Sequence, residues 1–259
     1  MKQELIKPIV KVGNSAGVLL PREWLNGKAK IELVEKPLNI KKDVLEILDP
    51  HLEDIIGIYL VGSYARNEQT KESDIDIMAV TNKTSNRIKQ GKYDILLITK
   101  EDVEKVLKYN VLPILPMLKE AETIINKDYL NSVKDILNKK ALKWHIEIVK
   151  SALKIDKGLI ELEKEYSDKS PDSIAYSLIL SLRSEYIVDS LRRNKIAKTR
   201  ELVALTRKIT GSAKLYEGYL RTKNNKKRID NLPISEAEKL LYYLEKKIKE
   251  QEKWIKRKD

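Results

Sequence analysis

Two acidic side chains separated by one residue stand at the start of an apolar run. Asp74 and Asp76 flank Ile75, and the run continues to Val80. In a β-strand, side chains alternate between the two faces, so both carboxylates would point to one side and Ile75 to the other. Neighbouring carboxylates repel each other and favour a proton or a cation between them. The pattern therefore predicts a site for a hard, oxygen-binding ion such as Mg2+.

A third acid lies in the next strongly apolar segment. Asp94 belongs to residues 93–98, which have the composition of a buried strand. An acid inside such a run costs free energy unless it is paired or binds a metal. If this strand lies next to that of Asp74 and Asp76, the three carboxylates converge. They would then hold two cations roughly 3.5 to 4 Å apart, which stabilise the attacking and leaving oxygens of a phosphoryl displacement.

A glycine and a serine follow an earlier apolar run, residues 58–61. This order is typical of a buried strand that turns tightly into the first turn of a helix. Glycine lets a phosphate approach the backbone, and a helix N-terminus offers unpaired N–H groups and the positive end of the helix dipole. The pattern indicates that Gly62 and Ser63 hold phosphates.

Together these segments resemble the signature of the DNA polymerase beta nucleotidyltransferase superfamily, and most closely its minimal nucleotidyltransferase branch. The resemblance rests on three pieces in this order, with ten residues between Ser63 and Asp74: Gly62-Ser63-Tyr64-Ala65-Arg66, Ser73-Asp74-Ile75-Asp76, and Asp94. One position departs from the pattern, because the family often has glycine after the Ala-Arg pair and this chain has Asn67. Asparagine tolerates a left-handed conformation, so we expect the turn to be kept.

The resemblance implies a role for each residue of this pattern. It assigns metal binding and catalysis to the three acids, Asp74, Asp76 and Asp94. Of these, Asp94 would also take the proton of the acceptor. Gly62 and Ser63 would hold the phosphates of the nucleotide, whereas Arg66 would either contact the phosphates or cap the helix.

The implied reaction moves a nucleoside monophosphate, with AMP from ATP as the expected case, to an acceptor hydroxyl with the help of two Mg2+ ions. Three interpretations stay open. The first is a protein or small-molecule acceptor, since by resemblance antitoxins of this branch modify a toxin partner with AMP. The second is an RNA-directed nucleotidyltransferase. The third is a DNA-binding regulator or antitoxin, although the three intact acids argue against a purely regulatory role.

The composition excludes several other kinds of site. The 259 residues include no cysteine and only two histidines, which excludes disulfides, thiolate metal sites and histidine-rich metal sites. Apolar runs stay well below the roughly 18 residues of a membrane span, and no apolar signal region follows Met1. We therefore expect a cytoplasmic protein without membrane contact.

The net charge of +12 is concentrated in one region. Residues 192–228 contain thirteen Lys or Arg against two Glu, a net charge of +11. Tyr216 and Tyr219 lie among these cations, an arrangement that suits base stacking and phosphate contact. The same residues also fit an ordinary amphipathic helix with a solvated basic face. Contact of this region with RNA therefore stays open.

The first 37 residues predict a small β-hairpin arm. Apolar segments at residues 6–12 and 17–20 surround a Gly13-Asn14-Ser15 turn, and residues 28–34 alternate again as a further strand would. The arm is similar to the AbrB-type swapped-hairpin family, whose members are usually dimeric and commonly bind DNA. The resemblance thus implies a homodimer, DNA contact, or both.

We expect an α+β fold in three parts. Residues 1–37 would form the hairpin arm, and residues 38–127 a nucleotidyltransferase domain with a mixed β-sheet and flanking helices. From Tyr129 onward apolar residues recur at helical spacing. Residues 128–259 would therefore form an α-helical bundle, which by resemblance binds the acceptor.

Overall fold

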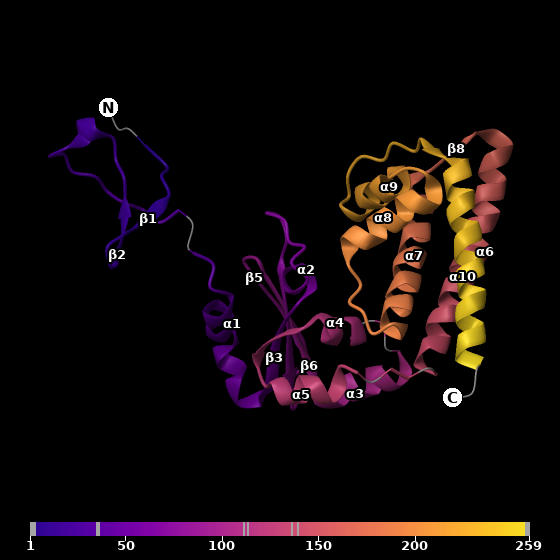
Figure 1. Ribbon diagram of the computed structural model, residues 1–259, viewed down its shortest axis with the longest axis horizontal. Helices are drawn as coiled ribbons and strands as arrows, with labels where there is room; N and C mark the ends of the chain where they lie inside the picture. Colours follow the sequence, from indigo (N-terminus) through magenta and orange to yellow (C-terminus); the bar gives the residue numbers. More distant parts are fainter. Residues whose placement is uncertain are drawn as a thin grey trace. The chain divides into compact units, whose positions relative to one another are not determined.

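The structure is a computed structural model. It describes residues 4–34, 37–110, 112, 114–135, 137–138 and 140–256. The chain divides into two compact units, residues 1–40 and residues 41–259, and Figure 1 labels their helices and strands.

The first unit contains a two-stranded antiparallel hairpin, as predicted. Strand β1 (Ile9–Val12) pairs with β2 (Ser15–Val18) across a turn at Gly13, whose φ of +59° favours glycine. A single-turn 3₁₀ helix, η1 (Arg22–Trp24), follows. The further strand expected at residues 28–34 is not formed; alternation alone does not make a strand where no neighbouring strand supplies hydrogen bonds.

This first unit has no interior of its own. None of residues 4–34 is buried, and large apolar side chains lie on its surface, with Ile6 83% exposed. A lone two-stranded hairpin is at best marginally stable in water. The hairpin unit therefore needs contacts with another surface to be stably folded.

The second unit is built on a five-stranded mixed sheet. The strands are β3 (Ile55–Val61), β4 (Ile75–Thr81), β5 (Asn86–Gln90), β6 (Tyr93–Thr99) and β7 (Glu122–Ile125). Their order is β5-β6-β4-β3-β7, and β4 and β6 are parallel while the other pairs are antiparallel. The strands predicted to carry the acids are therefore direct neighbours inside the sheet, which confirms the mixed α+β fold.

One face of the sheet packs against helices. Tyr59, Met78 and Val80 on this face share a core with α3 (Lys100–Tyr109), α4 (Leu115–Glu120) and α5 (Lys127–Val133). On the other side, the hydroxyl of Tyr93 donates a 2.7 Å hydrogen bond to Asp43 of α1 (Ile40–Leu48). The short 3₁₀ helix η2 (Asp49–Asp54) connects α1 to β3. The sheet thus lies between two helical layers (Figure 1).

Local capping explains where the helices of this layer begin. The hydroxyl of Thr99 accepts the N–H of Asp102 at 3.0 Å, which fixes the start of α3 directly after β6. Asn126 has a left-handed φ of +62°, and its side chain accepts the N–H of Tyr129 at 3.0 Å at the start of α5. Both caps are short polar residues at strand ends, so the turns are encoded locally.

The remaining chain is helical, as predicted. It consists of α6 (Ala141–Tyr166), α7 (Asp172–Arg192), α8 (Thr199–Thr210), α9 (Lys214–Lys223) and α10 (Ile234–Lys256), with a small bridge between β8 (Lys169–Ser170) and β9 (Leu232–Pro233). Leu142 of α6 and Val188 of α7 belong to the core of the sheet layer. The bundle and the sheet domain therefore share buried side chains. Among the described helices, none is long and apolar enough to span a membrane.

The two tyrosines of the basic region are packed inside the bundle. Tyr219 is 4% exposed and its ring stacks on Tyr176 at a centroid distance of 5.6 Å, with Tyr216 tilted against it at 5.5 Å. Arg221 of the same region forms an ion pair with the buried Asp172 at 2.7 Å. Base stacking on Tyr219 would require it to leave the core, so the amphipathic-helix interpretation describes these residues better.

Candidate active site

The turn after β3 is shaped by a glycine that faces an acid. Gly62 opens the four-residue helix α2 (Gly62–Ala65) with a φ of +72°, and a Cβ at this position would collide with the carboxylate of Asp76. Ser63 follows it in the first turn and is partly exposed. Asn67 has a φ of +55°, so the left-handed turn expected at this departure from the family pattern is kept. Only glycine allows the backbone to approach Asp76 this closely.

The acids of β4 and β6 lie side by side. Asp76 and Asp94 are direct partners in the parallel register, and both point to the face that carries Met78. Asp74 is the residue before β4 and is exposed. Burial raises the pKa of Asp76, and the negative charges of Asp94 and Asp74 raise it further. The structure thus brings the three predicted acids to one edge of the sheet.

Two cations on the neighbouring strand β5 hold Asp94. Arg87 donates from Nε and Nη2 to the two carboxylate oxygens at 2.6 and 2.8 Å, and Lys89 lies at 3.4 Å. The hydrogen bond from Arg87 holds the pKa of Asp94 below its usual range. Asp76 and Asp94 are therefore adjacent carboxylates with opposite pKa shifts, a difference typical of sites where two acids have separate roles.

Arg66 connects the turn to two other helices. Its guanidinium donates to Glu120 of α4 at 2.7 Å and to Glu68 at 3.0 Å, and its side chain is 14% exposed. Glu68 in turn accepts the N–H groups of Thr199 and Arg200 at 2.9 and 3.1 Å, at the start of α8. Of the two roles expected for Arg66, this geometry favours the structural one.

Several residues at the site were not anticipated from the sequence. Glu120 accepts the N–H of Gly62 at 2.7 Å, and burial raises the pKa of its carboxyl group. Arg87 lies on an edge strand with little apolar content, and Glu120 ends a six-residue helix. Neither position belongs to a recognisable motif. Arg87 acts across the hairpin that joins β5 to β6, seven residues from Asp94, and Glu120 acts through contacts that are distant in sequence. No sequence pattern available to us would have found them.

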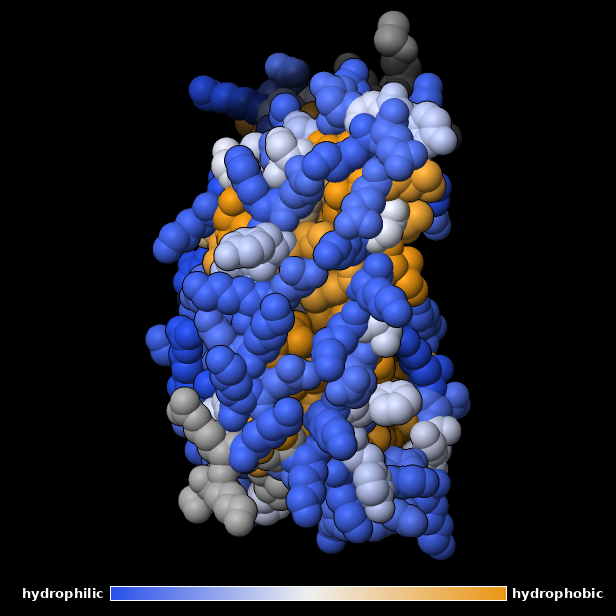
Figure 2. Space-filling model, turned by 90° about the vertical axis from the view of Figure 1, so that its right-hand side faces the viewer, coloured by the Kyte–Doolittle hydropathy of each residue, from blue (hydrophilic) through white to orange (hydrophobic). Residues whose placement is uncertain are grey.

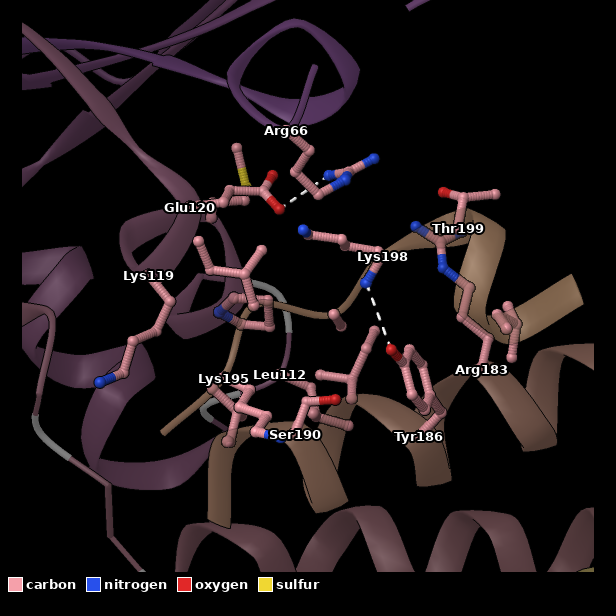
Figure 3. Close-up of a pocket in the computed structure, with 17 residues that line it drawn as sticks. Arg66, Leu112, Lys119, Glu120, Arg183, Tyr186, Ser190, Lys195, Lys198 and Thr199 are labelled. Carbon is pink, nitrogen blue, oxygen red and sulfur yellow. Dashed lines mark hydrogen bonds and ion pairs between the residues drawn. The ribbon is translucent and has the colours of Figure 1, made fainter. Parts of the chain in front are cut away.

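A cavity adjoins this turn on the side of the bundle. It encloses about 310 Å³ between α4 and the segment that joins α7 to α8. Figure 3 shows Lys198 reaching toward the pair of Arg66 and Glu120, while the hydroxyl of Tyr186 accepts the backbone N–H of Lys198 at 3.4 Å. Arg66 and Glu120 therefore line the end of the cavity that is nearest to the Gly62 turn.

The chemistry of the acids fits a divalent cation. Carboxylate oxygens are the ligands that Mg2+ prefers. Burial is the main cause of the raised pKa of Asp76, and the negative charges of Asp94 and Asp74, which a cation would neutralise, add to it. Within the described part of the chain, no three acidic or histidine side chains already stand together as a complete metal site. In this conformation Asp94 is directed to Arg87 instead.

The chain belongs to a family of nucleotidyltransferases. The family model described as a nucleotidyltransferase domain matches residues 39–181, which is more than half of the chain. This places the chain among enzymes that transfer a nucleoside monophosphate. The match begins after the hairpin arm, so the likeness of residues 1–37 to AbrB-type domains stays a prediction.

Solved structures with a related fold are distant in sequence. The nucleotidyltransferase-like protein from Exiguobacterium sibiricum 255-15 is 12% identical with a TM-score of 0.39, and the match covers 82% of this chain and 75% of that chain. Spectinomycin adenyltransferase AAD(9) from Enterococcus faecialis, solved with ATP and spectinomycin, is 14% identical with a TM-score of 0.42, covering 80% and 97%. No curated protein matches the chain.

Proposed function

We propose that this chain transfers AMP from ATP to an acceptor hydroxyl at the edge of the sheet where Asp76 and Asp94 are paired and Asp74 precedes β4. The observation that carries the proposal is the direct pairing of Asp76 with Asp94 beside the Gly62 turn. Arg87 and Lys89 compensate Asp94, whereas Asp76 has no cation hydrogen-bonded to it among the described residues, and a bound cation would offset its charge. Family membership supplies the class of reaction.

The chain's own residues would act as follows. The acceptor oxygen forms a bond to the α-phosphorus of ATP, the bond between the α- and β-phosphates breaks, and pyrophosphate leaves. Asp94 takes the proton of the acceptor hydroxyl once Arg87 has released it, and its low pKa in the present pairing would then rise. Gly62 and Ser63 hold the phosphates.

The three acids would hold two Mg2+ ions, one of which would be bound by all three. When bound, these ions would polarise the transferred phosphate and neutralise charge on the departing pyrophosphate. Asp76 is the ligand nearest the turn, because its carboxylate lies against Gly62. The acceptor would be a protein, such as a toxin partner, a small molecule or RNA.

The test is incubation of the protein with α-labelled ATP, Mg2+ and cell extract, followed by asking whether label enters protein, RNA or small molecules. The D76N variant should lose at least about 100-fold in transfer, and calorimetry should show weaker Mg2+ binding. Asp128, an exposed acid on α5, provides the matched control D128N. Undiminished transfer and Mg2+ binding by D76N would refute the proposal.

A second function is proposed for residues 1–37, through DNA binding or pairing of two copies. The supporting observation is that residues 4–34 expose their apolar side chains and bury none. A gel shift with duplex DNA at two salt concentrations, with and without residues 1–37, tests the DNA role. Unchanged DNA binding by the truncated chain would exclude it.

A further inference from the structure

The cavity beside the Gly62 turn carries unbalanced positive charge. Five cations line it, Arg66, Lys119, Arg183, Lys195 and Lys198, against one carboxylate, Glu120. Glu120 is already used by Arg66 and by the N–H of Gly62, and Lys119 pairs with Asp135. Within the described part of the chain, no carboxylate forms an ion pair with Arg183, Lys195 or Lys198. Three charges therefore remain for a ligand.

Part of the lining of the same cavity is apolar. Leu112, Met117 and Leu191 line it between α4 and α7, and Tyr186 and Ser190 add hydroxyl groups. Cavities of about 300 Å³ or more with apolar walls and a few converging polar groups are typical of small-molecule sites. The lining therefore suits a ligand with an apolar body and a negatively charged group.

The cavity is connected to the candidate catalytic edge through one side chain, Glu120. Glu120 contacts both Arg66, which lines the cavity, and the N–H of Gly62. Gly62 lies directly against the carboxylate of Asp76. A molecule held in the cavity would thus lie one side chain, Glu120, away from the turn that contacts Asp76.

We propose that this cavity binds the acceptor, and that the acceptor is an organic anion with an apolar body, held by Arg183 and Lys198. This inference rests on the proposed function, since it names the class of acceptor for the same site. A cationic acceptor would be repelled by the lining, whereas an anion would be attracted and oriented. The hydroxyl that receives AMP would lie at the end of the ligand nearest Asp94.

The test measures binding and does not depend on turnover. Phenyl phosphate serves as the probe, and it is titrated by calorimetry into protein saturated with Mg2+ and α,β-methylene-ATP, which fills the nucleotide site. We expect binding to persist, and to weaken at least tenfold in the double variant R183A/K198A. The control K157A changes an exposed lysine on α6 and should bind normally.

Three results would overturn the proposal. Loss of phenyl phosphate binding when the nucleotide analogue is present would assign the cavity to ATP. Equal binding of uncharged benzyl alcohol would remove the role of charge, and normal binding by R183A/K198A would place the anion elsewhere. Because none of these readouts uses transfer, they remain informative even if D76N shows that the proposed reaction is wrong.

A separate observation concerns the outer face of α6. Six large apolar side chains on this helix are between 42% and 81% exposed: Trp144, Ile148, Ile155, Leu159, Leu162 and Tyr166. Figure 2 views the side of the molecule where α6 and α10 lie in Figure 1, and a band of hydrophobic side chains crosses it. With the exposed Ser151, the spacing is 4-3-4-4-3-4, which is an 11-residue repeat taken twice, a period of about 3.67 residues that keeps one face of a helix toward a partner helix.

This spacing is the same when read in either direction, with Ile155 at its centre. A second copy of α6 running antiparallel would place Ile155 against Ile155 of the partner subunit, and Ile148 against Leu162 of the partner subunit. The charges of the two halves of α6 also match. The first half has a net charge of +2 and the second half −2, from Lys143, Glu147, Lys150 and Lys154 and from Asp156, Lys157, Glu161, Glu163, Lys164 and Glu165. Two-fold pairs are the commonest oligomers. We infer that two copies of this chain pair antiparallel through α6.

The absence of cysteine from the chain allows a direct test. Under mild oxidation at micromolar concentration, I155C should form a covalent dimer within minutes, since the two-fold axis brings that position next to its own copy. I148C and L162C should each remain monomeric alone but cross-link when mixed. The control Y242C, at an exposed position on α10, should not cross-link. Failure of I155C to cross-link, or efficient self-linking of I148C, would refute this pairing.

Discussion

Glu120 accepts the backbone N–H of Gly62 at 2.7 Å, while its other oxygen accepts from Arg66 at the same distance. A single buried carboxylate thereby holds the turn that the sequence associates with phosphate binding. In this conformation the Gly62 N–H is already satisfied. A phosphate that uses it must displace Glu120, or approach through Ser63 and the next residues of the turn.

Replacing this carboxylate should destabilise the fold. In E120Q the amide can still accept one hydrogen bond, but the buried guanidinium of Arg66 then keeps only Glu68 as a charged partner. Loss of a hydrogen bond to a charged group costs about 1.5 to 3 kcal/mol, so we expect a lower urea midpoint. The exposed neighbour Glu122 provides the control E122Q, and equal midpoints for both variants would contradict this role.

Alanine substitutions at Gly62 and Gly91 distinguish the effect of backbone strain from the effect of a collision with Asp76. Both have positive φ, +72° and +58°, but a Cβ at Gly91 meets nothing within 4 Å. G91A should lose about 1 kcal/mol of stability from strain alone. G62A should lose more, and should also lose transfer activity, because its methyl group must push Asp76 aside. Similar stability and activity in the two variants would show that the contact is unimportant.

Removing Arg87 should change how activity depends on pH. The hydrogen bond from Arg87 is the main cause of the low pKa of Asp94. In R87A that pKa should return toward its ordinary value in the free enzyme, so the acid limb of the pH profile of kcat/KM should move to higher pH. K89A removes the weaker 3.4 Å contact between Lys89 and Asp94 and should shift the acid limb less. An unmoved acid limb in R87A would mean that Asp94 does not limit the rate there.

The buried Glu185 should make stability depend on pH. Glu185 is 1% exposed, and this burial raises the pKa of its carboxyl group from 4.5 to about 7. The folded state therefore binds the proton more tightly than the unfolded state, and its contribution to stability is lost as pH rises from about 4.5 through 7. At pH 8 the E185Q variant should be more stable than the parent by on the order of 3 kcal/mol.

Urea unfolding at pH 5 and pH 8 checks this prediction, with the exposed Glu165 giving the control E165Q. His145 contributes in the opposite direction, because burial lowers its pKa to about 4 and protonation below about 6.5 favours the unfolded state. The contribution of His145 is the same in the parent and in the variants, so it cancels when their free energies of unfolding are subtracted. A pH-independent difference between E185Q and the parent would rule out the proposed ionisation.

The strands that carry the acids were predictable because their signal is local. Continuous apolar runs around Asp76 and Asp94 indicate buried strands, and the parallel register then places both acids on one face. Strand β5 escaped prediction because Asn86–Gln90 is an edge strand with one partly buried residue and no apolar alternation. Its position is fixed by pairing with β6, which no local pattern records.

The partners of the site residues were not predictable for a similar reason. Arg66 meets Glu120 across 54 positions, and Glu68 meets Thr199 across 131. Such contacts depend on how the sheet and the bundle pack together. The boundary expected near residue 127 likewise stays a proposal, because buried side chains of α6 and α7 lie in the core of the sheet layer.

Asp76 is followed at steps of two by Met78 and Val80, which are buried against the helices on the same face. The alternation of side chains along β4 thus fixes the orientation of the Asp76 carboxylate relative to the buried residues of the same strand. Adding or deleting a single residue just after Asp76 would turn this carboxylate toward α1 while Met78 kept its place. An apolar substitution that keeps the volume of Met78 or Val80 would leave Asp76 in place, whereas a change in the length of this segment would not.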